Sequence, residues 1–93
     1  MKIGFDLDNC LIRYYLNEDT PKYETIDLLR WFRENTDWEI ICWSGGGIPY
    51  TQRWVEKLGL NSFVRVIEKG GEEVDLAIDD EEVNLGKVNI KIN

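Results

Sequence analysis

Short apolar runs that alternate with amphipathic stretches constrain the fold of this chain more than any other feature. Four runs, rich in β-branched, aromatic and other apolar residues, predict strands: residues 2–5, 38–43, 63–67 and 74–78. Two stretches between them repeat apolar residues at helical spacing and predict helices: residues 23–34 and 49–58. Strands joined by helices form parallel sheets that are covered on both faces. We therefore expect a single α/β domain with a mainly parallel sheet of about five strands.

The ends of these elements carry local signals. Thr20 and Pro21 are typical of the cap and first turn of a helix, so we expect the first helix to begin there. Residues 10–20 lack a sustained period, which predicts a loop or a small hairpin. Gly59 is placed to end the second helix. The alternating residues 88–92 predict a fifth, half-exposed strand at an edge of the sheet.

The charge balance and the hydropathy of the chain limit its partners. The 93 residues include 11 Lys and Arg against 18 Asp and Glu, a net charge of -7, which disfavours binding to the phosphate backbone of duplex nucleic acid. The longest uninterrupted apolar run is residues 40–43, so neither a membrane span nor a secretory signal is predicted. We expect a soluble, cytoplasmic protein.

The chain contains two cysteines, Cys10 and Cys42, and no histidine. A zinc site built from Cys and His would need further ligands of another kind, so structural zinc is not expected. Nucleophiles activated by histidine are excluded as well. Any acid–base chemistry therefore depends mainly on carboxylates.

Acidic and hydroxyl side chains follow three of the predicted strands. Asp6 and Asp8 close the first strand, Ser44 follows the second, and Asp79 and Asp80 end the fourth. Ligands of open parallel sheets bind beyond the carboxyl ends of the strands, so these groups converge if the strands are parallel. Clustered carboxylates repel one another unless a hard cation joins them, which predicts a Mg²⁺ site. The plainer interpretation makes each acidic pair a solvated turn.

A serine and three glycines, residues 44–47, join the second predicted strand to the second helix. A hydroxyl, open backbone amides and a helix N-terminus suit a phosphate, although glycines here also serve a plain turn. No Gly-Lys-Ser/Thr follows, so a Walker nucleotide loop is excluded. Lys69, ten residues before Asp79, can reach the same edge, whereas a lysine beside two glycines is otherwise ordinary surface.

Taken in order, these motifs resemble those of the haloacid dehalogenase-like superfamily, which includes many phosphohydrolases. Residues 2–8, Lys-Ile-Gly-Phe-Asp-Leu-Asp, resemble its first motif, an apolar strand that ends in Asp-x-Asp. The strand that leads to Ser44 resembles the second motif. Lys69, with the strand that ends in Asp79 and Asp80, resembles the third and fourth, and Lys57 competes with Lys69 for the third. The resemblance spans nearly the whole chain.

The resemblance implies a three-layer, Rossmann-like core over residues 1–93 with no cap domain. The stretches available for a cap, residues 9–20 and 45–48, are too short to fold one. Cys10 stands where the family usually has Thr or Val, and we interpret it as a small buried hydrophobic residue. Asn9 stands where Gly is common. Gly46 stands where many relatives carry an Arg that contacts substrate, so that contact cannot be carried over.

The same resemblance implies the roles of the site residues. Asp6 is the nucleophile that attacks phosphorus to form an aspartyl-phosphate, and Asp8 protonates the leaving oxygen and then activates water. The implied Mg²⁺ ligands are Asp6, Asp8 through its backbone carbonyl, and the pair Asp79 and Asp80, one carboxylate of which suffices. The implied phosphate-binding groups are Ser44, the amide of Gly45, and Lys69.

We therefore expect a Mg²⁺-dependent phosphomonoester hydrolase whose partner is a small phosphorylated substrate, such as a sugar phosphate or a nucleotide. A capless site is open, so either a large substrate presents its phosphate to it or a second copy of the chain covers it. Tyr14, Tyr15 and Tyr50 are placed to border it, although packing is the commoner role of aromatic residues. One alternative is a phospho-accepting receiver domain. It is disfavoured because its acceptor aspartate would end a middle strand, whereas the middle strands predicted here end in Ser44 and near Glu68. The other is a non-catalytic module that binds metal or phosphate.

Overall fold

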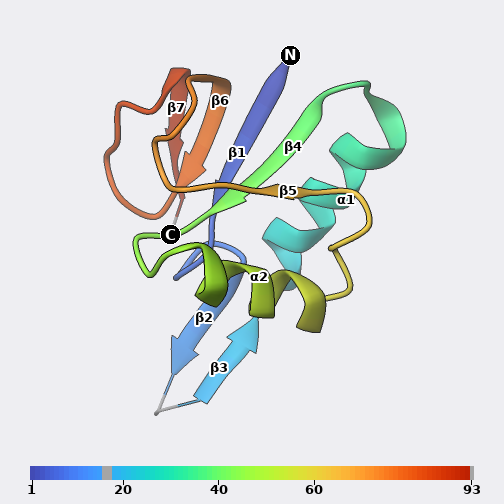
Figure 1. Cartoon of the computed structure of the whole chain (residues 1–93), viewed down its shortest axis with the longest axis vertical. Helices are drawn as coiled ribbons and strands as arrows, with labels where there is room; N and C mark the ends of the chain where they lie inside the picture. Colours follow the sequence, from blue (N-terminus) through green and yellow to red (C-terminus); the bar gives the residue numbers. More distant parts are fainter. Residues whose placement is uncertain (16–17, 93) are drawn as a thin grey trace.

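The computed structural model of the chain describes residues 1–15 and 18–92 (Figure 1). Its elements, in chain order, are β1 (Lys2–Asp6), β2 (Ile12–Tyr15), β3 (Glu18–Pro21), α1 (Tyr23–Asn35), β4 (Glu39–Trp43), α2 (Ile48–Lys57), β5 (Arg65–Val66), β6 (Val74–Asp79) and β7 (Gly86–Lys91). Five strands form a parallel sheet, whereas β2 and β3 form a separate antiparallel hairpin. The predicted α/β class and the parallel five-stranded sheet are confirmed.

The sheet has the strand order β5-β4-β1-β6-β7, with β1 at its centre. Counted along the chain, the five parallel strands lie in the order 3-2-1-4-5, which begins the Rossmann-like order. The chain builds outward from β1 to β5, then returns to the other side of β1 for β6 and β7. The order therefore reverses between β1 and β6, and ligands of such sheets bind at this point.

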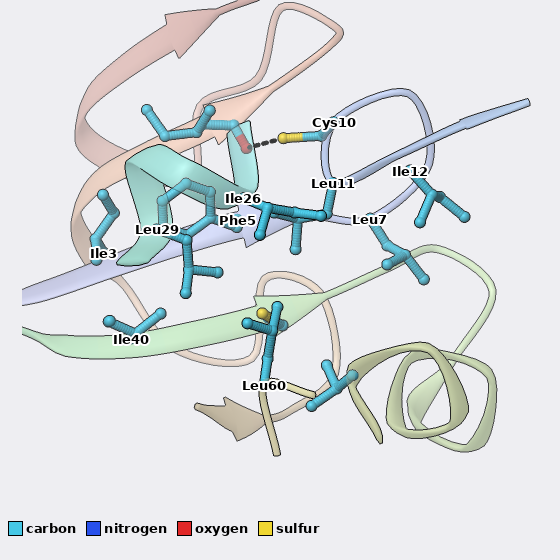
Figure 2. Close-up of a cluster of buried hydrophobic side chains, with 13 residues drawn as sticks. Ile3, Phe5, Leu7, Cys10, Leu11, Ile12, Ile26, Leu29, Ile40 and Leu60 are labelled. Carbon is cyan, nitrogen blue, oxygen red and sulfur yellow. Dashed lines mark hydrogen bonds between the residues drawn. The ribbon is translucent and has the colours of Figure 1, made fainter. Parts of the chain in front are cut away.

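Both helices pack against one face of the sheet. α1 contributes Ile26 and Leu29 to a buried cluster, and α2 contributes Val55. These side chains meet Ile3 and Phe5, the inward residues of β1, as the close-up in Figure 2 shows for the α1 side. The three-residue spacing along α1 puts its apolar residues on one side of the helix, as the sequence predicts. Neither described helix has the length and apolar character needed to cross a membrane.

A smaller apolar cluster covers the opposite face of the sheet. Its buried residues come from β4 and β6, and loop residues pack over them: Ile41, Trp43, Val74 and Ala77, with Ile67 and Leu85 above. Figure 1 shows that the connection from β5 to β6 passes across β4 and β1 before it reaches β6. Neither helix contributes to this cluster, so the expected helix layer covers one face of the described sheet. The three-layer arrangement is not confirmed.

A tight turn follows β1 and leads into the β2–β3 hairpin. The carbonyl of Leu7 accepts hydrogen bonds from three backbone amides, those of Cys10, Leu11 and Ile12. Asn9 adopts a φ of 58°, a left-handed conformation that asparagine tolerates better than most residues. The turn therefore reverses the chain at the point where β1 leaves the sheet, and the predicted hairpin within residues 10–20 is confirmed.

The expectation that Thr20 and Pro21 begin the first helix is wrong. Both residues belong to β3, where Thr20 pairs with Arg13 of β2. Lys22 precedes the helix, and α1 begins at Tyr23. Pairing with β2 therefore outweighs the local capping signal, and the helix begins two residues later than the signal predicts.

The strands at the two edges of the sheet differ from those at its centre. β5 covers only Arg65–Val66, shorter than the predicted run over residues 63–67. β7 lies at the other edge, as predicted, and its side chains Val88 and Ile90 are 56% and 44% exposed. The central strand β1 is buried from Ile3 to Asp6, so the sheet is most tightly held at the strand that carries the first acidic motif.

Candidate functional site

Three carboxylates gather where the strand order reverses. Asp6 ends β1, and Asp79 ends the adjacent strand β6, followed by Asp80. One oxygen from each of the three lies within 4.8 Å of the others. Because Phe5 pairs with Ile78, the next residues, Asp6 and Asp79, leave the sheet side by side. Sequence reasoning predicted this convergence from strand ends separated by more than seventy positions.

The cluster is buried more deeply than solvated turns would be. Asp6 is 4% exposed and Asp79 is 1% exposed. Oδ1 of Asp79 accepts a hydrogen bond from the backbone amide of Glu81 at 3.0 Å, and the buried Oδ2 lies 2.9 Å from the ammonium of Lys69. Buried carboxylates need positive charge beside them, and the oxygen donors here are the kind that a hard divalent cation takes.

Lys69 lies against two of these acids. Its Nζ donates a hydrogen bond to Oδ1 of Asp6 at 3.1 Å and lies 2.9 Å from Oδ2 of Asp79. The residue comes from the connection between β5 and β6, and Gly70, at a φ of 78°, turns the chain directly after it. Lys57 instead lies over the ring of Trp54, 4.6 Å from its centroid. The structure therefore brings Lys69, and not Lys57, to the acidic cluster.

The acids and the lysine shift one another's pKa values. Burial raises the pKa of Asp6 to about 7, the negative charge of Asp79 adds to the rise, and Lys69 opposes it. Burial acts to lower the pKa of Lys69, but pairing with Asp79 and Asp6 outweighs it and raises that pKa overall. Without a further cation, Asp6 is therefore only partly ionised near neutral pH.

Asp8 faces a different set of groups. Its Oδ2 accepts a hydrogen bond from the hydroxyl of Ser44 at 3.2 Å, and its Oδ1 accepts one from the hydroxyl of Tyr50 at 2.7 Å. The Asp8 carboxylate is not among the three that gather for a cation. The structure therefore engages the Asp8 side chain with two hydroxyl groups and does not bring it into the group of acids predicted to bind metal.

Ser44 sits at the start of the turn between β4 and α2. It is 3% exposed, and its Oγ accepts a hydrogen bond from the amide of Gly46 at 3.0 Å. Gly45 is exposed, and a side chain there would meet nothing within 4 Å. Gly47 has a φ of 96°, which favours glycine, and α2 begins at the next residue with no side-chain cap on its amides.

Tyr50 is the site residue whose contact sequence reasoning missed. The sequence placed it near the opening but offered no reason to join it to Asp8, because 42 residues separate the two. The one available signal is its position in the first turn of a helix that follows a candidate phosphate turn. The side chains of Tyr14 and Tyr15, also considered for the opening, lie outside the described residues.

The two cysteines belong to the core. Cys10 is fully buried, and its thiol donates to the carbonyl of Ile78, with 3.7 Å between sulfur and oxygen (Figure 2). Burial, with the charges of Asp6 and Asp79, raises its pKa far above the ordinary value, and burial raises the pKa of Cys42 to about 12. Neither thiol is available as a nucleophile, and Cys10 has the buried apolar role predicted for it.

Of the surface cavities, one lies near these residues and a larger one lies away from them. One of about 270 Å³ adjoins the acidic cluster at Asp80 and is lined by Asn9, Arg13, Lys22, Asp80 and Ile92. A larger one, about 480 Å³, lies at the amino ends of β4 and β5 and contains none of the candidate site residues. The charged groups that could carry chemistry therefore gather beside the smaller of these two cavities.

Comparison with known proteins adds no relative to this picture. No protein-family model matches the chain, and no curated protein or solved structure is significantly similar to it. Any functional assignment must therefore depend on the arrangement of the side chains described above.

Proposed function

We propose that the chain is a Mg²⁺-dependent phosphomonoester hydrolase, a capless member of the haloacid dehalogenase-like type that acts through an aspartyl-phosphate. One observation carries the proposal. Oxygens of Asp6, Asp79 and Asp80 lie within 4.8 Å of one another, and the Lys69 ammonium contacts two of these acids. An ordinary solvated turn does not bury two carboxylates beside a lysine at the ligand-binding point of a parallel sheet.

The residues present fit a magnesium ion. Asp6, Asp79 and Asp80 supply hard oxygen donors within 4.8 Å of one another, and the single positive charge of Lys69, which contacts two of these acids, does not balance three carboxylates. When bound, Mg²⁺ would neutralise the acids and offset the charge of the phosphoryl group that approaches them. Because burial raises the pKa of Asp6 to about 7, the cation would also favour the ionised form that a nucleophile requires.

Asp6 is the nucleophile of the proposed reaction. One of its carboxylate oxygens forms a bond to phosphorus while the bond from phosphorus to the leaving oxygen breaks. Lys69, 3.1 Å from Oδ1 of Asp6, reduces the repulsion between the carboxylate and the phosphate dianion. Ser44 and the amide of the exposed Gly45, just before the N-terminus of α2, are the groups proposed to bind the phosphoryl oxygens.

Asp8 is the acid and then the base. It is an exposed residue beside the buried cluster, so it can exchange protons with a substrate that arrives from solvent. Its carboxyl group donates a proton to the leaving oxygen, and the resulting carboxylate takes a proton from the water that attacks the aspartyl-phosphate. That attack releases inorganic phosphate and restores the carboxylate of Asp6.

The substrate proposed for this site is a small phosphomonoester such as a sugar phosphate or a nucleotide. The segments 9–20 and 45–48 supply a short hairpin and a turn rather than a cap, so the substrate meets the site from open solvent or beneath a second copy of the chain. Gly46 supplies no side chain to grip the substrate. We therefore expect the site to recognise mainly the phosphoryl group of its substrate.

The receiver-like alternative is disfavoured by strand order. Flavodoxin-like receiver domains have the order 2-1-3-4-5, whereas the parallel strands here lie in the order 3-2-1-4-5. The acceptor aspartate of a receiver domain would end a middle strand. The acids here end the first and fourth parallel strands instead, and the third, β5, does not end in aspartate. No observation specifically favours the non-catalytic alternative, and the experiment below distinguishes it.

Hydrolysis of p-nitrophenyl phosphate tests the proposal. We expect release of p-nitrophenol by the wild-type chain only when Mg²⁺ is added. Asp6→Asn should reduce the rate by about 10³-fold or more because it removes the nucleophile, and Lys69→Met by about 10²-fold because it removes one charge-stabilising group. Asp27→Asn, on the exposed surface of α1, is the matched control and should retain full activity.

Two other outcomes would contradict the proposal. A stably phosphorylated protein with no turnover, detected as a phosphate-sized mass increase, would favour a phospho-accepting domain. Binding of Mg²⁺ in a calorimetric titration with no hydrolysis of aryl, sugar or nucleoside phosphates would favour a module that binds metal without catalysis.

A further inference from the structure

Two different hydroxyl groups hold the two oxygens of Asp8. Tyr50 donates to Oδ1 at 2.7 Å, and Ser44 donates to Oδ2 at 3.2 Å. The tyrosine bond is the shorter of the two and has a length typical of a strong O–H···O⁻ contact. The carboxyl group of an exposed residue is thus fixed at both ends, which an acid that must meet a leaving group requires.

The backbone is shaped to let Tyr50 reach Asp8. The tyrosine ring lies against Gly46: a Cβ built there would come within 2.7 Å of ring atom Cδ2. That distance is far below van der Waals contact, so any side chain at position 46 would push the ring away. The glycine that the family resemblance left without a role therefore makes room for Tyr50.

Ser44 cannot serve both Asp8 and a substrate at once. Its Oγ accepts a hydrogen bond from the amide of Gly46, and its single hydroxyl hydrogen is used in the hydrogen bond that it donates to Oδ2 of Asp8. In the proposed reaction the same hydroxyl donates to a phosphoryl oxygen, so its bond to Asp8 must break when substrate binds. The proposed reaction does not require the Tyr50 hydroxyl to donate to the phosphoryl group, so its hydrogen bond to Oδ1 can persist.

We propose that Tyr50 is the positioning residue for the general acid: it holds Oδ1 of Asp8 while Ser44 turns to the phosphoryl group, so that Oδ2 carries the proton to the leaving oxygen. The inference rests on the proposed function. In the step concerned, Asp6 forms its bond to phosphorus, and the bond to the leaving oxygen breaks with its electron pair on that oxygen. The proton on Oδ2 then completes the leaving alcohol, and Asp8 is left as a carboxylate.

Tyr50→Phe tests the inference through its dependence on the leaving group. The variant keeps the ring and removes only the hydroxyl. We expect kcat/KM for phenyl phosphate and for an alkyl phosphate to fall by about 10- to 100-fold, because poor leaving groups need the proton. The change for 2,4-dinitrophenyl phosphate should stay within about 3-fold, because dinitrophenolate leaves without a proton. KM should change little, since phosphate binding is untouched.

Gly46→Ala is a second route to the same result. The added methyl group displaces the ring of Tyr50 and should produce the same leaving-group dependence, although Tyr50 itself is intact. Tyr23→Phe, in which the altered tyrosine is 65% exposed on α1, is the matched control and should leave all three substrates unaffected. Equal circular dichroism spectra for the variants and the wild type would show that the fold is kept.

The outcomes separate the inference from the function on which it rests. An equal loss for all three leaving groups, or no loss for the alkyl phosphate, would overturn the role of Tyr50 while the hydrolase stands. Absence of hydrolysis by the wild-type chain with every substrate would overturn the hydrolase and, with it, this role.

Discussion

At the scale of single residues, the carboxylate of Asp6 has conflicting demands. It is almost fully buried beside the charge of Asp79, which disfavours its ionised form, and it is paired with Lys69, which favours it. The first effect is the larger, so the pKa rises to about 7. Strain of this kind at a cluster of titratable groups is typical of functional sites.

The raised pKa of Asp6 predicts how stability depends on pH. The folded state binds the Asp6 proton more tightly than the unfolded state, so this residue stabilises the fold at acidic pH, and the contribution is lost as pH rises through about 7. With EDTA present, we expect the melting temperature to fall by about 10 °C between pH 5 and pH 8, because each pH unit of this titration is worth about 1.4 kcal/mol. The chain has no histidine to mask this change. Differential scanning calorimetry at intervals of half a pH unit measures it.

Two variants and one addition check that Asp6 is the cause. Asp6→Asn should remove most of the slope, whereas Asp27→Asn, on the exposed side of α1, should keep it. Mg²⁺ at pH 8 should restore the lost stability in the wild type, because a bound cation favours the ionised acids. A melting temperature that stays level or rises from pH 5 to pH 8 without metal would contradict the assignment.

At the scale of elements, the contact between β1 and β4 depends on an absent side chain. Trp43 is fully buried on the face away from the helices, and its ring lies over Gly4 of the neighbouring strand. A Cβ built at position 4 would come within 2.6 Å of ring atom Cζ2. The indole Nε1 has no hydrogen-bond partner among the described residues, so Trp43 stabilises this face through packing.

Gly4→Ala should therefore destabilise the sheet. The added methyl group must displace the indole ring or separate the strands, at a cost of about 1–3 kcal/mol. A domain of this size should lose about 4–8 °C in melting temperature for each kcal/mol. Gly45→Ala is the control, because its Cβ would meet nothing within 4 Å. Equal melting temperatures for Gly4→Ala and the wild type would contradict the packing described here.

Elements were predicted well where burial and periodicity agree. The apolar run that became β4 and the helical spacing of Ile26 and Leu29 needed no tertiary information, because both are read from the local pattern. The start of α1 was predicted wrongly because Thr20 carries a capping signal that strand pairing overrode. Residues 63–67 have the composition of a strand, yet only Arg65–Val66 pair with β4.

At the scale of the whole molecule, β1 is the strand on which the fold and the site both depend. It pairs with β4 on one side and β6 on the other, so its backbone groups are satisfied by two neighbours. The edge strands β5 and β7 have one neighbour each. The acids therefore project from the most constrained part of the sheet, which suits groups whose spacing must be held.

Native-state hydrogen exchange should reveal this gradient. We expect the amide exchange rates in β1 and in the inner strands β4 and β6 to be at least about tenfold lower than those in β7, because edge strands open without unfolding the centre of the sheet. Two-dimensional NMR after transfer to D₂O measures the rates. Equal protection of β7 and β1 would mean that the outer edge is covered in solution, and the exposed residues Val88 and Ile90 would then be the place to look for the partner.

The sequence by itself determined the strand-forming segments, the acidic strand ends at Asp6 and Asp79, and the serine turn, because these depend on local periodicity and residue type. Only the tertiary structure decided that Lys69 rather than Lys57 meets the acids, that both helices pack on one face, and that Tyr50 reaches Asp8 across the space left by Gly46. Those contacts join residues far apart in the chain, and the orientation of a side chain toward them depends on packing that no local pattern contains.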